Sequence, residues 1–448
     1  MSYINSSIGV TIVMSPEELY AATTRANLLN LEVYYYWATA IMILIHAGFL
    51  MYEMGASRVK HVLASGTKNI LAFAFMIPTF FMFGWWIYLA MYNGFVPDFE
   101  AGAGGVPWSD SMGPNLEDNA TGVFWGAFTL FACTTASIMS GSVIERIRMA
   151  SFIVLAVLLG SVVWILSAAW GWHYAGWMVT DWGYHDFGAS GVVHMISGFF
   201  ALGVLINLGP RVGKYNPDGS PNQIRGHSLP MTATGLMLIV VGFFGFLGAC
   251  LIFPGTELSW SATQWANIYG GPTTLSAICF NTLMAVAGGI IGCYAMTRDP
   301  FWMMSGALCG VISAAAGLDL WYPGLAFVVA FAGGVLGPWA ASIFERFGID
   351  DAVGAVSVHG VCGIWGLLSV GIFMGGYPGP SEEIPAITFT GQFVGTIVMF
   401  LLGFIPGYVV SWLFNKAGLL RASEPVQEAG MDKEINAVAY PEEIKSIH

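Results

Sequence analysis

Runs of about twenty apolar residues recur along the whole chain, and this feature limits the possible folds more than any other. A run of that length crosses the ~30 Å hydrocarbon core of a bilayer as one helix. Only 9% of the 448 residues are charged, whereas soluble domains carry about 25%. The short alternating segments of a transmembrane barrel are not seen. The sequence therefore predicts an all-α polytopic membrane protein.

Eleven apolar runs are long enough to serve as transmembrane helices. They lie near residues 33–55, 66–92, 120–142, 150–171, 188–208, 230–252, 268–296, 301–317, 322–345, 352–375 and 388–415. We expect two five-helix repeats followed by a C-terminal helix. The predicted parts are an extracytoplasmic N-terminal segment (1–32), the first repeat (33–208), a cytoplasmic connection (209–229), the second repeat (230–375), the eleventh helix (388–415) and a cytoplasmic tail (416–448).

The positions of the basic residues test this count independently. All but one of the 15 Lys and Arg residues fall in connections after odd-numbered runs or in the tail, and the exception is Arg25. By the positive-inside rule, the N-terminus is outside and the C-terminus is cytoplasmic. We expect a multi-pass protein of the cytoplasmic (inner) membrane. The net charge is −12, and the chain has no basic patch that would indicate a nucleic-acid partner.

Two histidines occupy matching positions in the two repeats. His194 lies in GVVHMISGFF and His359 lies in VSVHGVCGIW, so both begin the pattern H-x-x-[SC]-G-[FI]-[FW]-[AG]. They fall in runs five and ten, and an odd offset makes the two helices antiparallel. Such an inverted repeat brings equivalent positions together near the membrane midplane. A single histidine can be a packing residue between helices, but a matched pair favours a transport pathway.

Other ionisable and sulfur-containing side chains in the runs give weaker signals. Paired histidines can also ligate haem or a metal, but His46 and Glu53 are among the few additional ligand candidates within the bilayer. We therefore expect no cofactor and no enzymatic activity. We interpret Lys68 as a snorkelling side chain. The six cysteines lie in apolar segments, where small buried thiols are expected rather than disulfides.

Several segments resemble the ammonium transporter family (Amt/Rh), and most closely its bacterial and plant Amt branch. DFGASGVVH (186–194) and IDDAVGAVSVHGVCGIWG (349–366) are similar to two family signatures. Further similar segments follow in family order: GFLMYEMGASRVKHVL (48–63), FAC…ERIR (131–148), SLPMTATG (228–235) and GFFGF (242–246). The resemblance implies a homotrimer of eleven-helix protomers. It also implies that His194 and His359 line a pore in each protomer.

The resemblance assigns further roles residue by residue. Phe131 and Phe246 would be stacked phenylalanines that close the outer side of the pore. Asp186 would lie beside the external recruitment site, but an aspartate before a helix can cap its first turn, and we favour this role over direct contact with the ion. The family's vestibule tryptophan falls on Tyr174, or on His173 if one gap is allowed.

Three further positions depart from the family pattern. The vestibule serine falls on Cys250, whose thiol accepts hydrogen bonds poorly. A gate-side phenylalanine falls on Ala127, and an asparagine falls on Leu247. The outer site therefore keeps aromatic faces for cation–π contact but loses a hydroxyl acceptor.

The implied function is ammonium transport. Ammonium would be recruited at the outer vestibule and deprotonated, and ammonia would cross the apolar pore with or without the proton. The alternative is an Amt-like sensor that binds ammonium without conducting it. In the tail, GMDKEINAVAY (430–440) resembles a family motif. The resemblance implies a possible PII-type regulatory partner there, and we expect the tail to pack on its own trimer.

Overall fold

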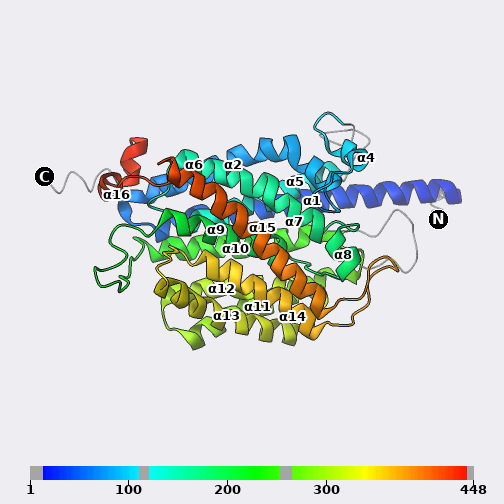
Figure 1. Cartoon of the computed structure of the whole chain (residues 1–448). Coiled ribbons are helices and arrows are strands. Elements are labelled where there is room, and N and C mark those ends of the chain that lie inside the picture. Colours follow the sequence, from blue (N-terminus) through cyan, green and yellow to red (C-terminus); the bar gives the residue numbers. More distant parts are fainter. Residues whose placement is uncertain (1–13, 110–120, 253–264, 441–448) are drawn as a thin grey trace, which may run out of the picture.

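The computed structural model describes residues 14–109, 121–252 and 265–440, and these form a bundle of roughly parallel helices (Figure 1). Eleven helical stretches make up the bundle, which confirms the predicted class and number. They are α1 (Pro16–Ala56), η1–α2–η2–α3 (Val59–Ala90), α5 (Thr121–Ser142), α6–η4–α7 (Met149–Gly171), η5–α9 (Ser190–Leu208), α10 (Leu229–Ala249), α11 (Leu275–Met296), α12 (Pro300–Ala315), α13 (Pro323–Arg346), η6–α14 (Val356–Phe373) and α15 (Phe389–Lys416). Within the described ranges, nine of these are long and apolar enough to span a membrane, and α5 and the shorter α12 complete the set.

Helix α1 begins earlier than the apolar run that identified it. It starts at Pro16 rather than near residue 33 and continues for 41 residues. Ser15 and Glu18 form a capping box, and proline at the first helical position favours the start. Figure 1 shows the N-terminal part of α1 extending past the other helices, at the opposite end from the C-terminal α16 (Glu424–Ala429). Termini at opposite ends agree with an odd number of spans.

Four of the spanning stretches contain a π-helical segment. These are η2 (Phe80–Gly84), η4 (Leu159–Val163), η5 (Ser190–Met195) and η6 (Val356–Val361). Short 3₁₀ segments are η1 (Val59–His61), η3 (Ala103–Gly105) and η7 (Met431–Ile435). Segments η5 and η6 begin the two stretches that carry His194 and His359. Since π-helical turns are rare and often mark functional sites, their occurrence at both positions supports a shared role.

Small elements cover the end of the bundle that the charge distribution places outside. They are α4 (Phe99–Gly102), α8 (Trp177–Trp182) and an antiparallel sheet of β1 (Leu251–Ile252), β2 (Trp265–Asn267) and β3 (Pro272–Thr273) in that order. Leu251 pairs with Asn267, and Trp265 pairs with Thr273. The sheet lies directly after α10, so it holds the outer end of that helix in place.

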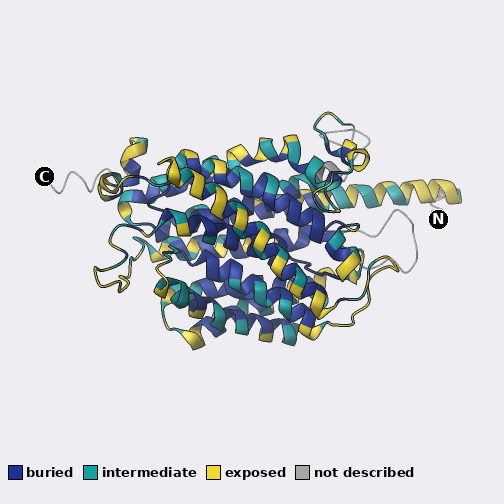
Figure 2. Ribbon diagram, in the orientation of Figure 1, coloured by how far each residue is buried: buried dark blue, intermediate teal, exposed yellow. Residues whose placement is uncertain are grey.

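Burial follows the pattern of a membrane protein. In Figure 2 buried residues fill the centre of the bundle, while exposed residues lie on its outer faces and at both ends. The outer faces are apolar, as shown by exposed Phe280 on α11, Val328 on α13 and Ile405 on α15. Such a surface suits lipid. The interior, in contrast, buries several charged side chains, among them Glu53 and Asp186.

A buried ion cluster ties the cytoplasmic ends of three helices together. Asp350, after α13, accepts hydrogen bonds from Arg211 Nε at 2.9 Å and Nη2 at 2.8 Å. Arg146, after α5, donates to the carbonyl oxygens of Asp350 and Gly209. Burial alone would raise the pKa of Asp350, but the Arg146 and Arg211 guanidinium groups outweigh burial and hold that pKa well below its usual range.

The Asp350 cluster predicts an acid-sensitive stability. Because the folded-state pKa of Asp350 is depressed, its stabilising contribution is complete above the unfolded value of about 4 and is lost as the pH falls further. Asp350→Asn leaves two buried guanidinium groups short of a counter-charge and should cost about 3–5 kcal/mol at pH 7. Thermal unfolding in detergent at several pH values measures both effects. Asp218→Asn, in an exposed loop, is the control, and equal unfolding temperatures for the two variants would contradict the prediction.

The tail folds back onto this same end of the molecule. Asp432 in η7 accepts hydrogen bonds from the backbone N–H groups of Leu63 and Ala64 at 3.2 and 2.8 Å, and so caps α2 (Val62–Thr79). Arg421 donates to the carbonyl oxygens of Leu208 and Pro210. The described tail residues therefore contact their own protomer, and packing on further copies of the chain stays a prediction.

Candidate functional site

His194 and His359 meet at the centre of the bundle. Their Nδ1 atoms are 3.1 Å apart and their ring centroids are 5.2 Å apart. The two side chains are almost completely buried, with 1% and 3% of each residue exposed. Since a neutral imidazole has one donor and one acceptor nitrogen, one ring donates its Nδ1–H and the other accepts with Nδ1. The contact therefore holds the two rings in opposite tautomers.

Two glycines let the histidine-bearing stretches approach this closely. Gly198 follows His194 by four residues, and a Cβ added there would lie 2.4 Å from the backbone N of Gly360. Gly363 follows His359 by four residues, and its added Cβ would lie 2.5 Å from the carbonyl oxygen of Ser190. Each stretch thus crosses the start of the other at a glycine. These are the glycines of the shared H-x-x-[SC]-G pattern.

An aspartate precedes each histidine by eight residues and fixes the start of its stretch. Asp186 Oδ2 accepts hydrogen bonds from the N–H groups of Gly191 and Val192 at 2.9 and 2.8 Å. Asp351 Oδ2 accepts one from the N–H of Val356 at 2.6 Å. Both carboxylates therefore cap a π-helical segment, so the capping role considered for Asp186 is what the geometry shows.

The backbone turns before the two histidines also match. Ala189 (φ 72°) and Gly354 (φ 76°) both adopt the left-handed conformation, each five residues before its histidine. Few non-glycine residues adopt this conformation. The left-handed conformation of Ala189 is therefore imposed by the residues packed around it. The two repeats are therefore similar in local backbone conformation as well as in sequence.

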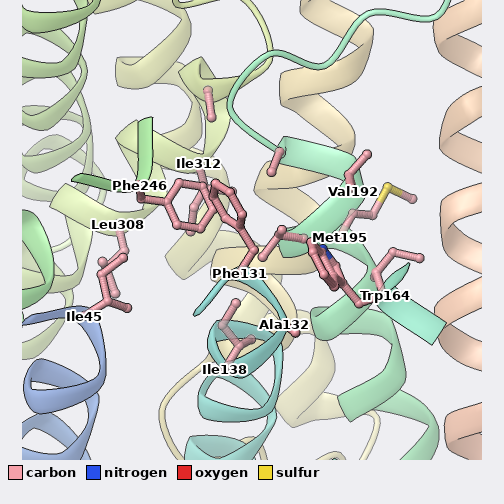
Figure 3. Close-up of a cluster of buried hydrophobic side chains, with 14 of the residues drawn as sticks. Ile45, Phe131, Ala132, Ile138, Trp164, Val192, Met195, Phe246, Leu308 and Ile312 are labelled. Atoms are coloured by element: carbon pink, nitrogen blue, oxygen red, sulfur yellow. The ribbon is translucent and has the colours of Figure 1, made fainter. Parts of the chain in front are cut away.

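Aromatic rings continue the histidine pair in both directions. Phe246 stacks on His194 with centroids 5.8 Å apart, and Phe131 contacts Phe246 at 4.5 Å. Figure 3 shows these two phenylalanine rings against each other, from α5 and α10. Their planes are at 86°, so they meet edge to face and not stacked as the resemblance implied. On the other side, the Phe49 ring lies 6.4 Å from His359. Together the five rings form a buried column.

Trp172 is one of the aromatic residues that contact Phe131 at the outer end of this column. Its ring lies 5.2 Å from Phe131, and its Nε1 donates to the carbonyl oxygen of Asp186 at 2.7 Å. Tyr174 is 67% exposed and stacks on His173 at 4.7 Å. Burial lowers the pKa of His173 to about 4, so this ring is neutral at pH 7. Burial thus decreases along the chain from Trp172 through His173 to Tyr174.

Two of the departures from the family pattern lie beside Phe131 and Phe246. Cys250 ends α10, and its thiol faces the carbonyl oxygen of Phe246 at 3.5 Å. Ala127 is buried and adds no ring, but neighbouring Phe128 contacts Phe131 at 5.6 Å. Phe128 therefore supplies an aromatic ring beside Phe131 although position 127 has none.

Asp186 combines its capping role with an open position. It is completely buried, and its Oδ1 has no hydrogen-bond partner among the described residues. Burial raises the pKa of Asp186 to about 6, although the hydrogen bonds from Val192, Gly191 and Tyr184 oppose this shift. Above that pH the carboxylate carries a negative charge close to Trp172.

A cavity of about 590 Å³ opens at the cytoplasmic end of the column. Its lining includes Ser357, two residues from His359, together with Val353 and Gly354 of the preceding turn. We call this cavity the cytoplasmic vestibule. The lining also contains charged residues, among them Lys214, Arg225, Asp299 and Glu345.

Sequence comparisons identify the family. A model of the Ammonium Transporter Family matches residues 33–440. The chain belongs to this family. The family is one of transporters and not of enzymes. In the described part of the chain, no group of three or more His, Cys, Asp and Glu residues is arranged to hold a metal ion.

Individual relatives agree with the family assignment. The ammonium transporter Amt2 of Archaeoglobus fulgidus is 31% identical over 92% of this chain and 89% of its own length. The ammonium transporter Amt1 of Methanocaldococcus jannaschii is 28% identical over 92% and 98%.

Solved structures of the family share the fold. A protein described as a sensor Amt protein has a TM-score of 0.75 at 24% identity, covering 92% of this chain and all of that one. Mep2 of Saccharomyces cerevisiae has a TM-score of 0.72 at 21% identity, covering 89% and 90%. At these identities the likeness concerns the fold alone.

Sequence reasoning missed two members of the site. Phe49 lies in the GFLMYEMG segment, but nothing in that segment marks which of its apolar side chains faces a histidine. Trp172, like Trp177, was noted only as lying close to the vestibule position, because alignment by spacing favoured Tyr174 or His173. Only the fold shows which of these aromatic rings reaches Phe131.

Proposed function

We propose that this protein transports ammonium across the cytoplasmic membrane through the column of Phe131, Phe246, His194, His359 and Phe49. The observation that carries the proposal is the 3.1 Å contact between the two imidazoles, enclosed by aromatic rings. Ionisable side chains inside a membrane protein are costly and usually mark a pathway. Family membership supports the same substrate.

The apolar column suits ammonia better than ammonium. Moving an intact cation through it costs several kcal/mol or more, while ammonia needs only modest hydrogen bonding. Potassium is similar in size to ammonium but has no proton to lose, so it remains charged and is excluded. Each histidine offers neutral ammonia a donor or an acceptor. We therefore propose that ammonium is deprotonated at the outer end and that ammonia passes the histidine pair.

Recruitment at the outer end relies on aromatic rings and on Asp186. Trp172 and Tyr174 offer π faces to a cation, the neutral His173 does not repel it, and Asp186 adds a negative charge nearby. Cys250 provides a weak acceptor in place of a hydroxyl. The site thus depends on cation–π contact more than on hydrogen bonding.

The recruitment site predicts different effects for its two candidate aromatics. Trp172→Ala removes the ring that contacts Phe131, and loss of a partly desolvated cation–π contact should raise the half-saturating ammonium concentration about tenfold. Tyr174→Ala removes a mostly exposed ring and should raise the half-saturating ammonium concentration only about twofold. Concentration dependence of ammonium uptake in proteoliposomes measures both, with Trp108→Ala, an exposed tryptophan, as the control. A larger effect at Tyr174 would place the recruitment site further out.

The decisive test of the function is ammonium transport by the purified protein. Proteoliposomes are exposed to an ammonium gradient, and current and internal pH are recorded together. Potassium gradients and protein-free liposomes are the controls. A saturable response to ammonium alone supports transport, and the two signals report whether charge accompanies it. No response in either signal would overturn the proposal and favour the sensor, which binds without conducting.

The proposal extends to the assembly. We propose a homotrimer in which each protomer has its own pore, and a cytoplasmic face that can meet a PII-type regulatory protein. The apolar outer faces of the bundle are compatible with contacts to lipid and to further copies. Light scattering on the protein in detergent measures the oligomeric state and tests whether the protein is a trimer.

A further inference from the structure

Tyr269, in the loop after β2, joins the two segments on which the proposed recruitment site depends. Its hydroxyl donates to the carbonyl oxygen of Gly171 at 2.8 Å and accepts the backbone N–H of Asp186 at 2.9 Å. Gly171 is the last residue of α7 (Trp164–Gly171) and directly precedes Trp172. A single hydroxyl therefore binds both the residue before Trp172 and Asp186 itself.

Asp186 and Trp172 also contact each other. Trp172 Nε1 donates to the carbonyl oxygen of Asp186 at 2.7 Å. Asp186 is therefore held through its backbone N–H by Tyr269 and through its carbonyl oxygen by Trp172, while its Oδ2 caps η5 and accepts a hydrogen bond from the Tyr184 hydroxyl at 3.1 Å. Only Oδ1 has no partner among the described residues. The orientation of Asp186 relative to Trp172 thus depends on Tyr269.

The turn between β2 and β3 fixes the position of Tyr269. The N–H of Asn267 donates to the carbonyl oxygen of Gly271 at 2.7 Å. Asn267 Oδ1 accepts the N–H groups of Tyr269 and Gly271 at 3.0 and 2.8 Å. Gly270 has a φ of 88°, which glycine adopts without strain. These hydrogen bonds close the turn, so Tyr269 cannot shift without opening it.

The turn is bound to the rest of the outer end by a buried carboxylate. Asn267 Nδ2 donates to Oδ2 of Asp319, which lies between α12 and α13, at 2.6 Å. Asp319 Oδ1 is 3.2 Å from His185 Nε2, and the His185 ring lies 4.8 Å from the Tyr269 ring. The backbone N–H and carbonyl oxygen of His185 both bind the side-chain amide of Gln392 on α15. Tyr269 and Asp186 are therefore fixed to the same group of helices.

The hydroxyl of Tyr269 is not required to fill space. The residue is 5% exposed, and a phenylalanine ring would occupy nearly the same volume. One explanation is that the hydroxyl only satisfies two buried backbone groups, as most buried polar atoms must be satisfied. The other is that it sets the geometry of the recruitment site. Only the second explanation links the hydroxyl to the affinity for ammonium.

We propose that Tyr269 is a positioning residue of the recruitment site, whose hydroxyl fixes Trp172 relative to Asp186. The proposal rests on the proposed function, because it concerns the recruitment step of ammonium transport. Tyr269 acts through the indole ring and the carboxylate and not by touching the ion. A cation–π contact requires the cation within about 6 Å of the ring centroid, and a misplacement of about 1 Å can cost much of the benefit of a positioned group.

Tyr269→Phe tests the proposal because it removes the hydroxyl and keeps the ring against His185. The half-saturating ammonium concentration for uptake in proteoliposomes should rise about fivefold, as expected for loss of one net hydrogen bond. The maximal rate should stay within about twofold of the wild type, because the histidine pair is untouched. A variant that lost only folded protein would lower the maximal rate and leave the half-saturating concentration unchanged.

A double variant with Trp172→Ala shows whether the hydroxyl acts through the indole ring. Residues that act on one interaction have non-additive effects. In the Trp172→Ala background, Tyr269→Phe should therefore raise the half-saturating concentration by less than about twofold. Equal fold increases with and without Trp172 would overturn the proposal, because the hydroxyl would then act independently of the ring.

Tyr35→Phe is the matched control. Tyr35 is 3% exposed, and its hydroxyl donates to the carbonyl oxygen of Leu251 at 2.6 Å at the same end of the bundle. This variant also removes a buried hydroxyl from a backbone partner, but it leaves Gly171 and Asp186 untouched. Its half-saturating concentration should stay within about 1.5-fold of the wild type. A rise as large as in Tyr269→Phe would overturn the proposal.

The same uptake measurements distinguish this proposal from the proposed function. If the wild type takes up ammonium and Tyr269→Phe has an unchanged half-saturating concentration, the positioning role is refuted and transport stands. If the wild type takes up no ammonium, the proposed function fails and the positioning role fails with it.

Discussion

Replacing both His194 and His359 with alanine should abolish selective ammonia passage. The double variant removes the only described hydrogen-bonding side chains within the aromatic column and leaves a void between Phe246 and Phe49. We expect ammonium uptake to fall about a hundredfold if the void stays dry, since ammonia then loses its donor and acceptor. If water fills the void, uptake persists and potassium enters. Ammonium and potassium uptake in the same proteoliposomes distinguish the two results.

The double variant needs a control for folding and one for histidine loss in general. His61→Ala removes a histidine that accepts a hydrogen bond from the N–H of Met431 in the tail and lines neither the column nor the cytoplasmic vestibule, so transport should not change. Thermal unfolding of the double variant shows whether the bundle is retained. Unchanged uptake and unchanged exclusion of potassium would refute the role of the pair.

The architecture could be predicted because it depends on long-range composition. The hydrocarbon core requires about twenty apolar residues per helix, and basic residues fall on one side, so eleven helices and their direction follow without knowledge of contacts. The start of α1 at Pro16 could not be predicted in this way, because capping by Ser15 and not hydropathy determines it.

The histidine pair could be predicted because an inverted repeat converts a sequence pattern into proximity. His194 and His359 share a pattern five spans apart, and antiparallel helices bring such positions together. The column around them could not be predicted to the same extent. Phe49 and Trp172 belong to it only because their helices pack as they do, and many other aromatic residues have equal apolar surroundings in the sequence.

Buried charges were the least predictable part. Lys68 lies near the start of its span, where a lysine ordinarily extends to the headgroups. Its ammonium group instead points inward, so the interpretation as a snorkelling side chain is wrong. Its true direction depends on Glu53 and Ser140, which are 15 and 72 residues away in the chain. A pattern within one helix carries no information on such partners.

Alanine at either glycine that follows a histidine, Gly198 or Gly363, should force the two histidine-bearing stretches apart. Gly198→Ala places a Cβ 2.4 Å from the backbone N of Gly360, and Gly363→Ala places one 2.5 Å from the carbonyl oxygen of Ser190. Both obstacles are backbone atoms, so no side-chain rotation relieves the clash. The two stretches must separate, which should cost about 1–3 kcal/mol for each substitution.

Separation of these stretches should affect function more than stability, because the clash lies one turn from the imidazole contact. Even an extra 1 Å between the Nδ1 atoms lengthens their 3.1 Å separation beyond hydrogen-bonding distance. We therefore expect Gly198→Ala and Gly363→Ala to lower ammonium uptake about tenfold or more at a modest loss of thermal stability. Gly126→Ala is the matched control: it also lies in a spanning helix, but its added Cβ meets only Thr39 Cγ2 at an ordinary 3.7 Å. The measurement is ammonium uptake by the three alanine variants, normalised to the amount of folded protein. Uptake should be low in Gly198→Ala and Gly363→Ala and close to that of the wild type in Gly126→Ala. If Gly198→Ala and Gly126→Ala transport equally well, the column does not depend on close crossing at the histidines.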